Sequence, residues 1–239
     1  MADFACSRAV TASIAGPQGD ELYNDPPEPP QIDRIRAFSP DIVILWIGGN
    51  DIGFADLRNQ CVLSAEDCTA DRVRTERALS EARALEPRLK ALYESIVTGS
   101  RASLYVPAYP QIFDQPSGGD CGSLASDEAA FGAELIETVD NAIRKAAADA
   151  AVDGYRVKFV ASTQEAFAGH GACQPDPLVH TVTFGGLLEA ERHVAGGQEL
   201  LHPTEAGYEA LTSEVSSAIA KSLSTPNPPS RESNPAILR

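Results

Sequence analysis

Continuous hydrophobic runs mark three places in the chain where buried strands are expected. They read IVILWIGG at 42–49, SLYVPAYP at 103–110 and RVKFVAS at 156–162. Such runs do not alternate between hydrophobic and polar positions as a half-exposed strand would, and they are typical of strands covered on both faces of a parallel sheet. The stretch DFACS at 3–7 is a candidate for the end of a further strand.

Helical periodicity fills the intervals between these strands. We expect helices at 31–38, at about 71–98 with a break near Pro87, at about 126–152 and at about 204–223. Strands that alternate with long helices predict an α/β fold with a parallel sheet. A length of 239 residues suits one domain, which we place at 1–224, and the polar, Pro-rich tail 225–239 is expected to be disordered.

Charge and hydropathy exclude several functions. The formal net charge is −15 and Lys and Arg do not cluster, so a nucleic-acid partner is not expected. No apolar stretch approaches the roughly 18–20 residues of a membrane span. The first ten residues, MADFACSRAV, lack a basic region and a long apolar region, so we expect no signal peptide in this chain.

The five cysteines point to disulfides. Cys61 and Cys68 bracket a short polar loop, and Cys121 and Cys173 lie in loops of their own. Loop cysteines in a polar chain favour disulfides, and no Cys-x-x-Cys spacing supports zinc. Two disulfides among the other four cysteines would leave Cys6 without a partner. The alternative is that all five are free thiols of a cytosolic protein.

Two polar residues stand where chemistry gathers in an α/β sheet, outside the C-terminal ends of the strands. Asn50 follows the first strand in GGND, where the two glycines permit a sharp turn and a side-chain amide suits oxyanion binding. His202 lies in ELLHPTEAGY at 199–208, just before the last helix. The simpler alternatives are that Asn50 and Asp51 only cap the next turn and that His202 only packs.

These motifs resemble those of the SGNH (GDSL-type) serine esterases and lipases, especially the secreted, disulfide-bonded bacterial and fungal branch. The matching stretches come in the family's order: FACSRAVT, DIVILWIGGNDIGFADLRNQC, VPAYPQIFD, FAGHGAC and ELLHPTEAGY. The resemblance implies a flavodoxin-like three-layer α/β/α fold and secretion. It also implies a cofactor-free monomer that hydrolyses small acyl esters or lipids through an acyl-serine intermediate.

The resemblance also assigns roles to individual residues. It makes His202 the general base and Asn50 the oxyanion-hole side chain. Glu199 would orient the imidazole through its carboxylate or its backbone carbonyl. The second oxyanion donor is a backbone N–H that the family usually takes from a glycine, and here that position is Arg8.

The family's nucleophile is missing from the sequence. It is a serine in a Gly-Asp-Ser motif on the first strand, and no such motif occurs in this chain. We therefore expect a sheet without its first strand and a domain that is inactive and poorly stable as it stands. Ser7 lies near the end of a strand, but its family equivalent is not catalytic.

The same resemblance specifies the disulfides. It implies the pairs Cys61–Cys68 and Cys121–Cys173. The equivalent of Cys6 pairs with a cysteine nearer the N-terminus in related enzymes, so Cys6 is expected to be free.

Other interpretations stay open at this point. The chain is alternatively a noncatalytic binding or scaffold protein that keeps the pocket, or an unrelated α/β protein with chance matches. Ser117 and Ser123 lie in a loop without a base in sequence context. The scattered histidines His170, His180 and His193 favour structural roles over a metal site.

Overall fold

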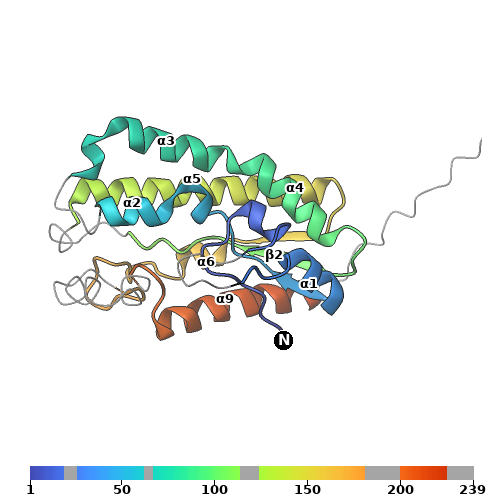
Figure 1. Ribbon diagram of the computed structural model, residues 1–239. Coiled ribbons are helices and arrows are strands. Elements are labelled where there is room, and N and C mark those ends of the chain that lie inside the picture. Colours follow the sequence, from blue (N-terminus) through green and yellow to red (C-terminus); the bar gives the residue numbers. More distant parts are fainter. Residues whose placement is uncertain (19–25, 62–66, 114–123, 181–199, 225–239) are drawn as a thin grey trace, which may run out of the picture.

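The computed structural model describes residues 1–18, 26–61, 67–113, 124–180 and 200–224, which form three layers (Figure 1). The middle layer is a parallel sheet in the order β1 (Ile42–Ile44), β2 (Ser103–Pro107) and β3 (Val157–Val160). Val43 pairs with Leu104, and Tyr105 pairs with Lys158. The side chains of β2 are almost wholly buried, which explains its continuous hydrophobic run.

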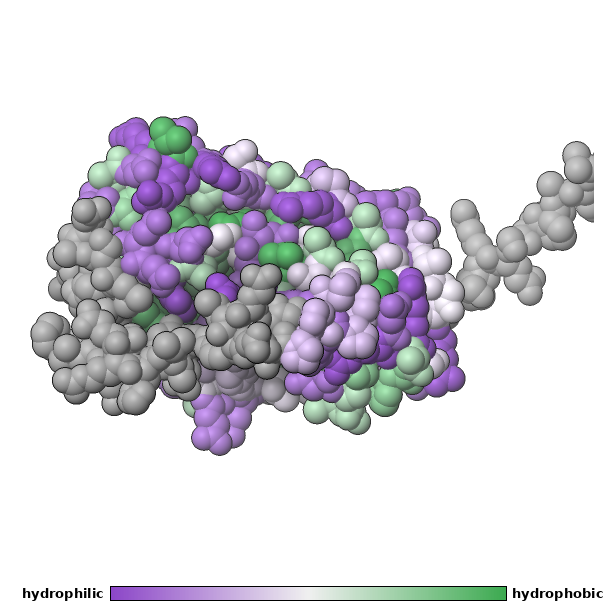
Figure 2. All heavy atoms as spheres, viewed as in Figure 1, coloured by the Kyte–Doolittle hydropathy of each residue, from purple (hydrophilic) through white to green (hydrophobic). Residues whose placement is uncertain are grey.

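Helices α3 (Arg72–Arg83), α4 (Leu85–Val97) and α5 (Ser126–Val152) cover one face of the sheet (Figure 1). The buried side of α5 is rich in alanine, including Ala142, Ala146 and Ala150, so this helix packs closely against α4 and β3. The outward face of α3 is mainly hydrophilic (Figure 2). No helix in the described ranges is long and apolar enough to cross a bilayer.

The opposite face carries α6 (Ser162–Glu165) and α9 (Glu205–Ser224), which Figure 1 shows below the sheet. The remaining elements are short and connect the layers. They are η1 (Thr11–Ile14), α1 (Gln31–Phe38), η2 (Asn50–Ile52), α2 (Phe54–Cys61) and η3 (Cys68–Ala70). Helix α1 contacts η1, so the N-terminal segment packs beside it.

The helix boundaries agree closely with those expected from periodicity, with one informative difference. The predicted helix at 71–98 does break, but at Ala84 rather than at Pro87. Pro87 lies in the first turn of α4, where backbone N–H groups have no intrahelical acceptor, so a proline is tolerated there.

Two strand predictions need correction. The first strand was expected at 42–49, but it ends at Ile44, and the last bond to β2 runs from the Leu45 N–H to the Tyr105 carbonyl at 3.0 Å. The expectation of a strand end at 3–7 is wrong, since these residues make no ladder pairs with the described strands. Residues 3–6 line a groove of about 370 Å³ along β1, where Ile44 stays 49% exposed.

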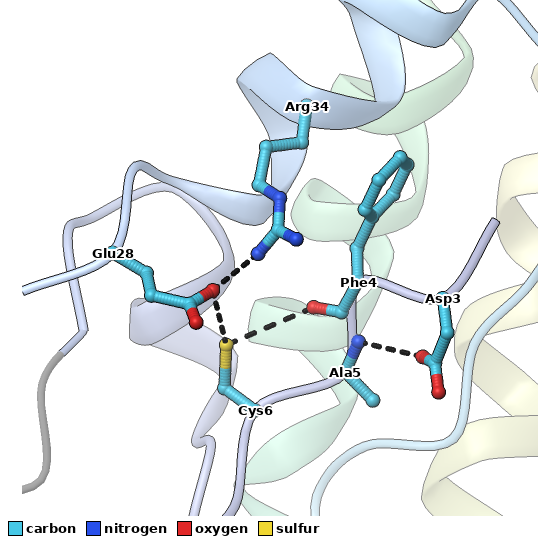
Figure 3. Close-up of polar contacts among 6 residues, drawn as sticks. All are labelled: Asp3, Phe4, Ala5, Cys6, Glu28 and Arg34. Atoms are coloured by element: carbon cyan, nitrogen blue, oxygen red, sulfur yellow. Dashed lines mark hydrogen bonds and ion pairs between the residues drawn. The ribbon is translucent and has the colours of Figure 1, made fainter.

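Local contacts hold the N-terminal segment instead (Figure 3). The Ala5 N–H donates to Asp3 Oδ1 at 2.9 Å. The Phe4 ring lies under the Arg34 guanidinium, 4.7 Å from ring centroid to Cζ, and Arg34 pairs with Glu28. None of these contacts is a backbone hydrogen bond to β1, so they do not extend the sheet.

The structure confirms one disulfide and the free thiol. Cys61 and Cys68 are bridged, with their Cα atoms 4.9 Å apart, and Cys6 is free. Desolvation and then the nearby Glu28 carboxylate raise the pKa of the Cys6 thiol above its ordinary value. Cys173 is disulfide-bonded, and Cys121, its predicted partner, lies outside the described residues, so that pairing stays a prediction.

Candidate active site

A cavity of about 300 Å³ brings together the two leading candidate residues. Asn50 and His202 both line it, and both are solvent-exposed. Residues after β1 and after β2 contribute to its wall, so it lies outside the C-terminal ends of the strands, as expected for this kind of sheet. Most of the lining is apolar, including Trp46, Ile52, Phe54, Ile112, Leu135 and Leu211. Its size and character suit a small apolar ligand.

The Asn50 amide is held in place by the segment that precedes η1. Its Nδ2 atom donates to the Ala9 carbonyl oxygen at 3.0 Å, and the amide's second N–H is not needed for that bond. Gly48 has a φ of +119°, a backbone conformation that residues other than glycine rarely adopt. This glycine therefore lets the chain leave β1 and turn Asn50 toward the cavity.

Asp51 ties the same two segments together. Its side chain is 3% exposed and accepts hydrogen bonds from Thr11 N at 2.9 Å and Thr11 Oγ1 at 2.6 Å. Arg88 approaches the carboxylate at 3.4 Å. Both side chains bond to the segment 9–11, so the interpretation that Asn50 and Asp51 only cap the next turn is wrong. Sequence reasoning gave Thr11 no role, although it is the last residue of the FACSRAVT stretch.

A series of buried hydrogen bonds supports the turn that carries Asn50. The Gly49 N–H donates to the Tyr109 hydroxyl at 3.1 Å, and the Tyr109 N–H donates to Asp140 Oδ1 at 2.7 Å. Asp140 is fully buried, and its Oδ2 has no hydrogen-bond partner in the described part of the chain. Burial raises the pKa of Asp140 to about 7, against its bond from Tyr109 and the charge of Arg144. Neither Tyr109 nor Asp140 was predicted from the sequence.

Backbone pairing with a second loop fixes His202. The Leu201 N–H donates to the His180 carbonyl at 3.0 Å, and the His180 N–H donates to the His202 carbonyl at 2.9 Å. His202 Nδ1 lies 3.4 Å from the Leu200 carbonyl oxygen. Glu199, predicted to orient the imidazole, lies outside the described residues. The described neighbour of Nδ1 is therefore the carbonyl of Leu200, and the predicted role of Glu199 stays a prediction.

Residues 3–210 match the model of the GDSL-like Lipase/Acylhydrolase family. The chain belongs to this family. It is 32% identical over 145 residues to a lipase of Streptomyces rimosus, covering 60% of this chain and 51% of that protein. It is 31% identical over 166 residues to Lipase 1 of Streptomyces coelicolor, covering 66% of this chain and 56% of that protein. The chain thus spans about half the length of the curated relatives it matches.

Solved structures confirm the predicted three-layer α/β fold. Phospholipase A1 from Streptomyces albidoflavus is similar with a TM-score of 0.65 and 26% identity, over 89% of this chain and 77% of that one. The extracellular lipase of Streptomyces rimosus is similar with a TM-score of 0.61 and 26% identity, over 87% of this chain and 78% of that one.

The structure does not bring the other two predicted residues of this GDSL-like chain into the cavity. Arg8 is exposed and has a φ of 61°, within a turn closed by the bond from Ala9 N to Cys6 O. That left-handed conformation favours glycine, which is the residue the family usually has there. Ser7 is exposed as well, and its carbonyl accepts from Gln18 Nε2 at 2.6 Å.

The remaining candidates lie apart from the cavity or outside the described ranges. His170 Nδ1 contacts the Asp176 carbonyl at 2.9 Å, and His193, Ser117 and Ser123 are not described. Among the described residues, the one group of closely spaced metal-ligand types is Cys61, Cys68 and Glu128. Its two cysteines are the disulfide, so their sulfurs are not thiolate ligands.

Replacing Gly207 with alanine should destabilise the protein by about 1–3 kcal/mol, because the site has no room for a methyl group. A Cβ there would overlap the Leu178 carbonyl oxygen and lie 3.0 Å from the Phe167 ring. That carbonyl already accepts the Thr204 N–H at 2.9 Å, just beyond His202. Urea unfolding should show the loss, and Ser213→Ala on the exposed side of α9 is the control. Equal midpoints for the two variants would contradict the prediction.

Proposed function

We propose that this chain supplies the general base and the oxyanion-binding side chain of a carboxylic-ester hydrolase that acts on acyl esters or lipids. The observation that carries the proposal is the shared cavity, in which Asn50 and His202 meet beside an apolar wall. The relatives are named as lipases and a phospholipase A1, which supports an ester substrate. The Cys61–Cys68 disulfide and the extracellular S. rimosus lipase support secretion, and we propose a monomer.

The geometry supports a division of labour between the two residues. With the Nδ1 proton directed to the Leu200 carbonyl, His202 Nε2 is left as the acceptor for a nucleophile's hydroxyl proton. Asn50, already fixed by Ala9, donates its other N–H to the oxygen of the tetrahedral intermediate. The apolar wall binds the acyl chain.

We propose that this chain does not supply the nucleophile. None of the described residues that line the cavity is a serine or a cysteine, and the sequence contains no Gly-Asp-Ser motif. We propose that the chain alone hydrolyses esters only at background rate. The second candidate function, a noncatalytic protein that binds acyl compounds, is favoured by the same observation.

Adding the missing element tests this proposal. The chain would be compared with a version extended at its N-terminus by a strand, a Gly-Asp-Ser motif and a cysteine to pair with Cys6. With short-chain p-nitrophenyl esters, the extended chain should exceed both the parent and a matched Gly-Asp-Ala extension by a factor on the order of 10⁶. A fluorophosphonate probe should label only the serine version.

Two results would change the assignment. A folded, stabilised extension without activity would favour the noncatalytic function. Robust, His202-dependent hydrolysis by the unextended chain would show that the nucleophile lies within it, and Ser7 would be the first residue to examine.

A further inference from the structure

We propose that Arg58 makes this cavity selective for lipid esters that carry a phosphate group close to the acyl chain. The inference rests on the proposed function, because it assigns a substrate class to the same cavity. Arg58 lies on α2, which begins directly after the turn that carries Asn50. It lines the same cavity as Asn50 and His202.

The position of Arg58 on its helix directs it to the cavity. Phe54 and Ala55 precede it by four and three residues, and both line the cavity with it. Residues at this spacing share one face of a helix. One face of α2 therefore presents an aromatic ring, a methyl group and a cation to the same space.

The charge of Arg58 is partly withdrawn from water without a balancing anion. The side chain is half-buried and donates to Asn59 Oδ1, a neutral acceptor, at 3.0 and 3.3 Å. No carboxylate within the described ranges forms an ion pair with it. Desolvation lowers the pKa of the guanidinium. A bound anion would restore the charge balance that burial removes.

Arg88 provides an internal comparison. It lines a second cleft of about 480 Å³ on another side of Asn50, but there Asp51 already approaches it at 3.4 Å. Of these two arginines, Arg58 is the one that no carboxylate of the described ranges approaches, in a chain whose formal net charge is −15. Its planar guanidinium matches phosphate oxygens in a two-point contact.

The rest of the lining fixes the kind of anion. Apolar side chains such as Trp46, Ile52 and Leu135 dominate the wall, and their burial favours an alkyl or acyl chain. Inorganic phosphate would bind Arg58 but would bury no apolar surface against the cavity wall. A neutral ester would fill the cavity but leave the guanidinium uncompensated. A phosphate-bearing amphiphile satisfies both parts.

Trp46 permits a direct test on the chain as it exists. It is the single tryptophan of the protein and it lines the cavity, so its fluorescence reports binding. Dodecyl phosphate, dodecyl maltoside and inorganic phosphate would be titrated separately below their critical micelle concentrations. Dodecyl phosphate should bind at least about tenfold more tightly than dodecyl maltoside, because a charge-assisted hydrogen bond adds to the apolar contact. Inorganic phosphate alone should bind weakly.

Variants locate the effect. Arg58→Gln should abolish the preference for dodecyl phosphate and leave the affinity for dodecyl maltoside unchanged. Arg58→Lys should retain part of the preference, since a lysine keeps the charge but not the two-point geometry. Arg83→Gln removes an exposed arginine of α3 and is the matched control, which should behave like the parent.

The outcomes separate this inference from the proposed function. Equal affinity of the parent for the two amphiphiles, no binding of either, or an unchanged preference in Arg58→Gln would overturn the phosphate selectivity. Tight binding of inorganic phosphate alone would assign Arg58 to a free-anion site instead. Arg58-dependent selectivity together with an inactive serine-extended chain would leave this inference standing and remove the hydrolase assignment.

Discussion

In the serine-extended chain, replacing His202 with alanine should lower kcat by a factor on the order of 10⁶, close to the loss expected from removing the serine itself. The reason is that base and nucleophile act as one unit, and a serine hydroxyl without its proton acceptor is a weak nucleophile. KM should change little, because the apolar wall that would bind the acyl chain stays intact. Initial rates with a short-chain p-nitrophenyl ester would measure both constants.

Two further variants make that result specific. Asn50→Ala removes the proposed oxyanion donor and should lower kcat by a factor of about 10²–10³, clearly less than loss of the proposed base. His170→Ala is the matched histidine control, because its Nδ1 contacts the Asp176 carbonyl and it does not line the cavity. Comparable losses for His170 and His202 would point to a general loss of structure, and an active His202→Ala enzyme would remove the assigned base.

The helices and the cavity's two polar residues were predictable because their signals are local. Helical periodicity predicted the range of α5, 126–152, and the glycines before Asn50 marked a turn that leaves a strand. His202 was identifiable from the proline after it and the helix that follows. Each of these patterns is complete within a few dozen residues.

The support around the site was not predictable because it depends on contacts between distant segments. Asp51 binds Thr11 forty residues away, and Asp140 binds the Tyr109 N–H thirty-one residues away. A buried carboxyl on a long helix has no sequence signature that distinguishes it from a surface one. The failed strand at 3–7 has the same cause, since a strand exists only where a partner ladder satisfies its backbone groups.

The buried Asp140 also gives the protein a specific dependence of stability on pH. Its pKa in the folded state is about 7, whereas an ordinary aspartate titrates near 3.9. Between these values the unfolded chain has released the proton that the folded chain still holds. The free energy of unfolding therefore falls as pH rises from about 4 to about 7, by on the order of 4 kcal/mol if no other group compensates.

Replacing Asp140 with asparagine should remove this loss. The amide oxygen can still accept the Tyr109 N–H, now bonded at 2.7 Å, but the group can no longer ionise. The variant should match or fall slightly below the parent near pH 4 and exceed it by a few kcal/mol near pH 8. Nearby Tyr93 and Tyr109 keep their protons throughout, because burial raises both pKa values. The other charged neighbours, Arg144 and Glu137, are common to parent and variant.

Urea unfolding followed by Trp46 fluorescence at several pH values from 4 to 8 would measure the difference. Glu134→Gln, an exposed carboxylate on the same helix, is the control and should shift the curve by much less. A gap between Asp140→Asn and the parent that stays constant across this range would show that Asp140 is ionised in the folded protein. In that case its Oδ2 would require a partner beyond the residues described, because a buried unpaired carboxylate is too costly to persist.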